Sequence, residues 1–131
     1  MIRNDRFRTP LKRARGLGSA KDGTHHFIVQ RITAIALIFL SIYVVGLVVW
    51  LVGADYAAVR AAVAHPFNAV LLVAFLIASF WHAQLGMQVI IEDYVHTPWL
   101  AVTSQLTVIF VCVLAALASV LAVVRIALGA A

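Results

Sequence analysis

Apolar residues fall into three long runs along this chain. The runs extend over residues 32–53, 67–91 and 100–124. Each is longer than the roughly 20 residues that a helix needs to cross the hydrocarbon core of a bilayer. The pattern predicts an all-α membrane protein with three transmembrane helices, over about residues 28–53, 67–92 and 100–125.

Polar residues and prolines between the runs set the expected boundaries. Residues 1–24 are expected to form an irregular basic arm, and residues 25–131 the three-span domain. Thr24 is expected to cap a helix that starts near His25, while Pro66 and Pro98 suit the first turns of the second and third helices. Residues 54–66 are expected to form a loop.

The composition also indicates a membrane protein. Of the 131 residues, 64% are hydrophobic and 11% are charged, whereas about a quarter of the residues of a soluble domain are charged. The single cysteine, Cys112, lies in the third run, where we expect it to pack. One cysteine cannot hold an iron–sulfur centre, and the sequence has no glycine-rich nucleotide motif or nucleophile elbow.

Basic residues are concentrated before the first run. Eight of the ten Lys and Arg residues precede or open it, and only Arg60 and Arg125 come later. By the positive-inside rule the N-terminus is cytoplasmic, residues 54–66 are external and the loop at residues 92–99 is cytoplasmic. A basic arm can bind nucleic acid, but here a topology signal that also contacts anionic lipid or a partner is favoured.

One histidine, His82, lies deep in the second run. An ionisable group in hydrocarbon is costly, which makes it a candidate functional residue. It either hydrogen-bonds a neighbouring helix or serves as an axial ligand to a haem iron between helices. Ser79 and Gly86, at i−3 and i+4, leave its face lightly covered, which suits the approach of a porphyrin.

The chain has no second histidine at this depth. A haem with two histidine ligands needs both at a similar level, and the other four histidines lie at or beyond the ends of the runs. The second ligand must therefore come from another chain, either a second copy of this one or a different subunit.

Asp93 and Tyr94 lie about three helical turns after His82, at the cytoplasmic boundary, roughly 16 Å away along the helix axis. A tyrosine hydroxyl there can donate a hydrogen bond to a quinone carbonyl, and an adjacent carboxylate can relay protons. The alternative is an interfacial tyrosine beside a solvated acid. These residues alone favour that alternative.

A second polar group lies where the first helix begins. His25, His26, Gln30 and Arg31 share one or two helical turns at the cytoplasmic boundary. Such a cluster can bind an anionic head group or a carboxylate. The simpler alternative is that Arg31 extends to the interface, and the residues by themselves favour it.

Two segments resemble the hydrophobic membrane anchor subunit of succinate dehydrogenase, the second of the two membrane chains of complex II. The resemblance lies in residues 23–37, in the run His82-Ala-Gln-Leu-Gly-Met-Gln88, and in Asp93-Tyr94-Val95. It covers roughly residues 16–127. It implies a complex with a second anchor chain (cytochrome b556), an iron–sulfur subunit and a flavoprotein that carries FAD.

The resemblance also implies roles for individual residues. His82 matches the axial ligand of a haem b shared with the other anchor, and Tyr94 matches the residue that hydrogen-bonds ubiquinone, with Asp93 beside it. Arg31 and His25 match polar positions near the haem propionates and the quinone pocket. The role of His26 is left open.

The resemblance implies an anchor through which electrons from succinate reach ubiquinone in a bacterial inner membrane or, alternatively, a mitochondrial inner membrane. A fumarate reductase anchor and a small non-redox membrane protein are the rival hypotheses.

Overall fold

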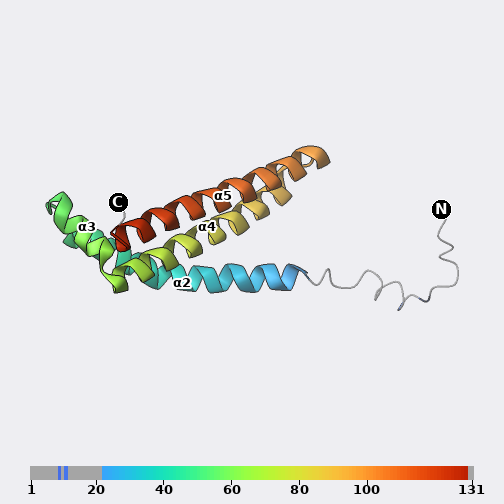
Figure 1. The fold of residues 1–131 in the computed structure, drawn as a ribbon. Coiled ribbons are helices and arrows are strands. Elements are labelled where there is room, and N and C mark those ends of the chain that lie inside the picture. Colours follow the sequence, from blue (N-terminus) through green and yellow to red (C-terminus); the bar gives the residue numbers. More distant parts are fainter. Residues whose placement is uncertain (1–8, 10, 12–21, 130–131) are drawn as a thin grey trace.

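The structure, a computed structural model, describes residues 9, 11 and 22–129, and it is helical through most of that range (Figure 1). The helices are α2 (Asp22–Trp50), α3 (Tyr56–Ala64), α4 (Pro66–Tyr94) and α5 (Pro98–Ala127). Three of them, α2, α4 and α5, are long and apolar enough to cross a membrane. The all-α, three-span prediction is confirmed. Most of the basic arm at residues 1–24 lies outside the described residues.

Two of the predicted helix starts are confirmed. Pro66 and Pro98 open α4 and α5, where a proline lacks only an N–H that has no intrahelical partner in any case. The first span was expected to reach residue 53, but α2 ends at Trp50. The chain then turns through Gly53, whose φ of 82° is easily adopted only without a side chain.

Two local predictions were wrong. Helix α2 already includes Asp22, so Thr24 lies in its first turn and does not cap it. The N–H groups of a first turn need no intrahelical acceptor, so polar residues of weak helix propensity are tolerated there. The expected loop at residues 54–66 contains α3, an alanine-rich segment of high helix propensity. Asp55 caps α3, because its Oδ1 accepts the N–H of Ala58 at 2.8 Å.

Helix α4 is the central element of the bundle (Figure 1). It packs against α2 on one side and α5 on the other, while α2 and α5 do not contact each other directly. Apart from Thr33, the buried residues of the described chain are all apolar: Ala62, Ala69, Leu85 and Ile91. Many large apolar side chains are exposed, among them Phe39, Phe110 and Leu121, and lipid or other chains must cover them.

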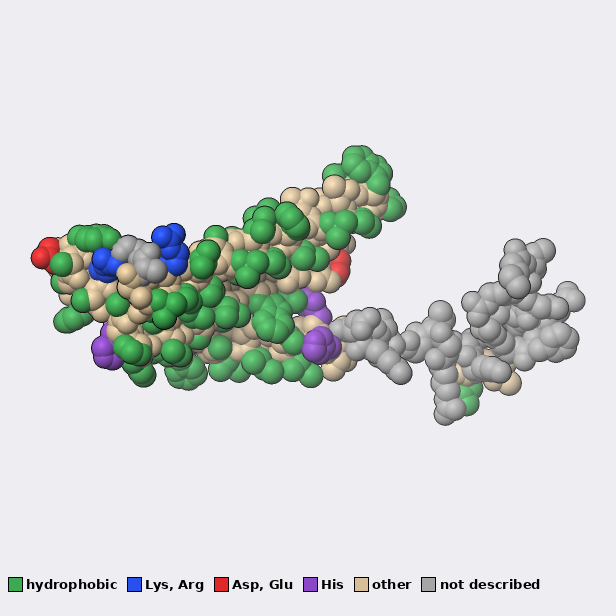
Figure 2. All heavy atoms as spheres, viewed as in Figure 1, with side chains coloured by type: hydrophobic (Ala, Val, Ile, Leu, Met, Phe, Trp, Pro, Cys, Tyr) green, Lys and Arg blue, Asp and Glu red, His purple; other side chains and the backbone are tan. Residues whose placement is uncertain are grey.

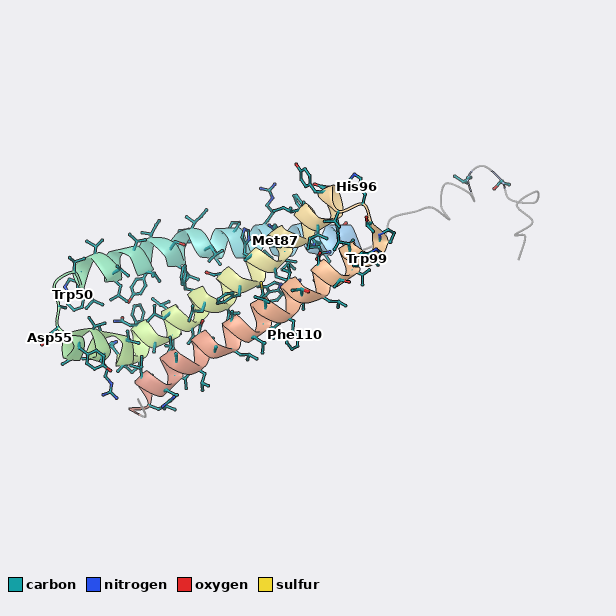
Figure 3. All side chains as sticks on the ribbon, turned by 90° about the horizontal axis from the view of Figure 1, so that it is seen from above. Trp50, Asp55, Met87, His96, Trp99 and Phe110 are labelled. Carbon is teal, nitrogen blue, oxygen red and sulfur yellow. The ribbon has the colours of Figure 1, made fainter. Side chains whose placement is uncertain are left out.

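The two ends of the bundle differ in composition. We call them the Tyr94 end, where α2 begins and α4 ends, and the Arg125 end, where α3 and the last turn of α5 lie. In Figure 2 apolar side chains cover most of the length of the bundle, and charged and histidine side chains gather at its ends. Figure 3 shows Trp50 and Asp55 at one end and His96 and Trp99 at the other.

A polar network joins α2, α3 and α4 toward the Arg125 end. The Tyr43 hydroxyl donates a hydrogen bond to Oδ1 of Asn68 at 2.6 Å, and Nδ2 of Asn68 donates to the carbonyl of Ala62 at 2.8 Å. The rings of Tyr43 and Phe67 pack edge to face, with centroids 5.9 Å apart. These contacts fix the start of α4 against α2.

Candidate functional site

A groove lies between α2 and α4 toward the Tyr94 end. Its volume is about 760 Å³, within the range of cofactor-binding pockets. Helix α2 lines one wall and α4 the other, and we call this space the α2–α4 groove. Apolar side chains form much of both walls, among them Val29, Ala34, Leu85 and Val89.

His82 lines this groove from α4. Its Nδ1 lies 3.0 Å from Oγ1 of Thr33, a hydrogen bond that crosses to α2. Thr33 is only 7% exposed, whereas His82 is half-buried and faces the groove. The hydrogen bond to a neighbouring helix that the sequence allowed is thus present. It engages Nδ1 and leaves Nε2 as the ring nitrogen through which His82 can meet a ligand.

The α2 wall carries the polar cluster predicted at the start of the first helix. His25, His26, Gln30 and Arg31 all line the groove. The Arg31 guanidinium lies over the ring of Phe27, 5.1 Å from its centroid, which orients the cation. This wall therefore contributes a positive charge, that of Arg31, to the groove that His82 also lines.

Two polar atoms of this cluster are buried without a hydrogen bond. They are Nε2 of His26 and Oε1 of Gln30. A buried polar atom without a partner costs about 1–3 kcal/mol, so native proteins rarely leave one. Both atoms belong to side chains that line the groove, which makes the groove a place where an additional polar group would be stabilised.

The end of α4 contributes a different acid from the predicted one. Glu92 lines the groove and accepts a hydrogen bond from Nε2 of Gln88 at 2.8 Å. Asp93 and Tyr94 are exposed beyond the groove lining, and Tyr94 is 79% exposed. The structure therefore brings His82, His25 and Arg31 to one groove and leaves Asp93 and Tyr94 beside it, at the same end of the bundle.

The small residues flanking His82 do not line the groove. A Cβ built on Gly86 would lie 3.9 Å from Nε2 of Gln30, an ordinary van der Waals contact. Gly86 thus faces the Gln30 side chain on α2, and Ser79 is also absent from the lining. The space expected at Gly86 is partly filled by α2, and the groove opens beside it.

Three contributors to the site were not singled out by the sequence analysis. They are Thr33, Gln88 and Glu92. Thr33 follows His26 and Gln30 at i+7 and i+3, so all three lie on one face of α2. That spacing was the available signal for Thr33.

Cys112 is a half-buried free thiol beside a smaller pocket between α4 and α5.

The chain is thus a helical membrane protein with three spans and a groove between α2 and α4 that both apolar and polar side chains line. Residues 5–122 match the family model described as the succinate dehydrogenase/fumarate reductase transmembrane subunit. The chain belongs to this family.

Curated relatives carry a narrower name. The chain is 39% identical over 89 residues to the succinate dehydrogenase hydrophobic membrane anchor subunit of Rickettsia bellii, an alignment that covers 68% of this chain and 71% of the relative. It is 33% identical to the subunit of the same name from Paracoccus denitrificans, covering 95% and 96% of the two chains. A Rickettsia conorii relative of that name is 33% identical over 88% and 93%. These relatives support a role as an anchor subunit of succinate dehydrogenase.

Proposed function

We propose that this subunit supplies half of a haem b site and part of a ubiquinone site, so that electrons from succinate reach the quinone pool. The observation that carries the proposal is His82, an imidazole at membrane depth that faces a groove of cofactor size. The chain itself carries out no succinate chemistry. FAD and the iron–sulfur centres belong to partner subunits.

The residues of the α2–α4 groove fit a haem. Apolar side chains form much of both walls, the imidazole of His82 lines the groove from α4, and its Nδ1 is already bonded to Thr33. A metal-ligating histidine characteristically donates its other ring N–H in this way. A bound haem would supply a one-electron redox centre, and His82 would hold its iron through Nε2.

Positive charge on α2 fits the carboxylates that haem carries. Arg31 and His25 line the groove on the α2 side, and Arg31 is oriented by Phe27. A guanidinium can hold a carboxylate with two parallel hydrogen bonds, so Arg31 is the stronger of the two candidates for a propionate. The unpartnered Nε2 of His26 lies in the same wall.

A second ligand to the haem iron would come from another chain. Among the described residues, His82 is the one histidine in the middle of a span, since His65 and His96 lie at helix ends and His25 and His26 lie in the first turns of α2. We assign the missing ligand to the second membrane anchor of the complex. The exposed apolar faces of α2 and α5 give that partner a surface to pack on.

Tyr94 and Asp93 form this chain's part of the quinone site. Both side chains project from the Tyr94 end and are exposed in the isolated chain, so a partner subunit can enclose them. There the Tyr94 hydroxyl donates a hydrogen bond to a quinone carbonyl, and the Asp93 carboxylate is placed to pass protons to the reduced oxygen. We place this end on the cytoplasmic side of a bacterial inner membrane, where the iron–sulfur subunit docks.

Purification of the tagged chain from its native membranes tests the proposal. We expect a flavoprotein, an iron–sulfur protein and a second membrane chain to purify with it. The complex should show a b-type reduced-minus-oxidised spectrum and succinate-dependent quinone reduction. Purification without haem and without a flavoprotein would identify a non-redox membrane protein instead.

A further inference from the structure

The Thr33 hydroxyl has three polar neighbours at hydrogen-bonding distance. Its Oγ1 lies 2.9 Å from the carbonyl oxygen of Val29, 3.1 Å from that of Gln30 and 3.0 Å from Nδ1 of His82. Thr33 is the buried polar residue of the described chain, so water does not compete for these contacts. The arrangement of protons among these four atoms follows from their chemistry.

A hydroxyl carries one proton and two lone pairs. If Thr33 donated its proton to Nδ1, two carbonyl oxygens would lie about 3 Å from Oγ1 with no proton between them. If Thr33 instead donates to its own helix, its one proton is shared between the carbonyls of Val29 and Gln30. Oγ1 then accepts the proton of Nδ1, and all three contacts are favourable. The second arrangement satisfies every atom.

We infer that Thr33 is a positioning residue that holds His82 in the tautomer protonated at Nδ1, which leaves the lone pair of Nε2 for coordination of the haem iron. This inference rests on the proposed haem site. It adds a residue on α2 that sets the tautomer and the ring angle of the imidazole on α4.

The hydrogen bond has two consequences for a ligand. It restrains rotation of the imidazole ring, and this restraint is lost if the hydrogen-bond partner on α2 is deleted. It also strengthens electron donation from Nε2 to a bound metal, since a ring N–H that donates to an oxygen pushes electron density toward Nε2. A stronger electron donor stabilises ferric over ferrous iron, so removal of the Thr33 hydroxyl should raise the midpoint potential of a haem held by His82.

The test compares Thr33→Val and Thr33→Ser in the whole purified complex. Valine keeps the branched shape and removes the hydroxyl, whereas serine keeps the hydroxyl. We expect Thr33→Val to raise the haem midpoint potential and to change the g values of the ferric haem in its electron paramagnetic resonance spectrum. Thr33→Ser should restore both. A wild-type potential and wild-type g values in Thr33→Val would overturn the inference.

Thr107→Val is the matched control. The Thr107 hydroxyl also donates to the carbonyl four residues earlier, that of Thr103 at 2.8 Å, but it has no histidine partner. Its removal should leave the potential and the g values unchanged, and a shift equal to that of Thr33→Val would make the effect a general one of helix perturbation and overturn the inference. If Thr33→Val fails to assemble, Thr33→Ala against Thr33→Ser makes the same comparison, and equal potentials for the two would count against the hydroxyl.

The inference and the proposed function fail separately. A normal haem spectrum in the His82→Ala complex would contradict the proposed haem site itself. Loss of haem in His82→Ala, together with an unchanged potential and unchanged g values in Thr33→Val, would support the proposed function and contradict only the positioning role of Thr33.

Discussion

The two faces of α4 are built differently. Toward α2, side-chain hydrogen bonds cross between helices at two levels, Thr33 to His82 and Tyr43 to Asn68. On α5, Thr103 and Thr107 direct their hydroxyls to carbonyls of α5 itself. Polar contacts between helices thus occur beside the groove and at the entry of α4, while α5 satisfies these hydroxyls internally and presents apolar side chains outward.

The difference indicates separate tasks for the two faces. A hydrogen bond between membrane helices is worth only about 0.6 kcal/mol on average, so such bonds are a weak source of stability and a stronger source of alignment. The α2 face aligns His82 with the groove, and the α5 face supplies packing. Substitutions on the two faces should therefore affect different measurements.

The largest expected effect is that of His82→Ala. Removal of the imidazole deletes the one mid-span histidine of the described chain and with it the proposed iron ligand, so the b-type absorbance of the purified complex should be lost or strongly shifted. The measurement is the reduced-minus-oxidised spectrum normalised to FAD. His65→Ala, at the opposite end of α4, serves as the control and should leave the spectrum unaltered.

Tyr94→Phe is expected to have the next largest effect. Loss of one hydrogen-bond donor to the quinone should reduce succinate–quinone activity by about tenfold, which corresponds to roughly 1.4 kcal/mol. Reduction of an artificial dye that accepts electrons upstream should be spared. Tyr56→Phe removes an equally exposed hydroxyl at the Arg125 end and should change neither activity. Equal survival of both activities in Tyr94→Phe would leave Tyr94 as an interfacial residue.

Tyr43→Phe should weaken the contact between α2 and α4 toward the Arg125 end and leave the haem in place. The Tyr43 hydroxyl bonds Asn68 at 2.6 Å, and its removal should destabilise the subunit by about 1 kcal/mol. The measurement is the temperature at which the detergent-solubilised complex dissociates, with the haem spectrum recorded in parallel. Loss of the haem signal without a change in that temperature would contradict the view that the Tyr43–Asn68 bond serves stability and the Thr33–His82 bond serves the haem site.

The smallest effect is expected for Thr103→Val. This hydroxyl bonds only the carbonyl of Trp99 on its own helix at 2.7 Å, and substitutions at such outward-facing positions usually change stability by no more than about 0.5 kcal/mol. Haem content, quinone activity and dissociation temperature should all match the unchanged complex. A clear loss of haem in Thr103→Val would contradict the view that the haem site depends on the α2 side of α4 and not on α5.

Most of the fold follows from the lengths of the apolar runs. A run of more than 20 apolar residues has few stable alternatives to a transmembrane helix, and prolines at the starts of α4 and α5 fix their first turns. The short helix α3 was missed because its alanine-rich segment lies between runs and carries no long hydrophobic period. Its signals were local, the capping Asp55 and the helix propensity of alanine.

The candidate site was predictable where it depends on single residues. His82 stood out because an imidazole is expensive in hydrocarbon, and the polar start of α2 was recognised as a cluster. The groove places both together. Thr33 was missed because its partnership with His82 depends on how α2 and α4 are aligned, which no local pattern specifies. The assignments of Tyr94 and Asp93 to a quinone stay predictions.

The two hydrogen bonds between α2 and α4 together set the register of these helices. They lie ten residues apart on α2, about 15 Å along the helix, so a slide of α2 by one residue, about 1.5 Å, would strain both at once. One bond alone would leave α2 able to rotate about it, and the second removes that freedom. Because both walls of the α2–α4 groove belong to these two helices, the pair of bonds also fixes where His82 lies relative to the polar start of α2.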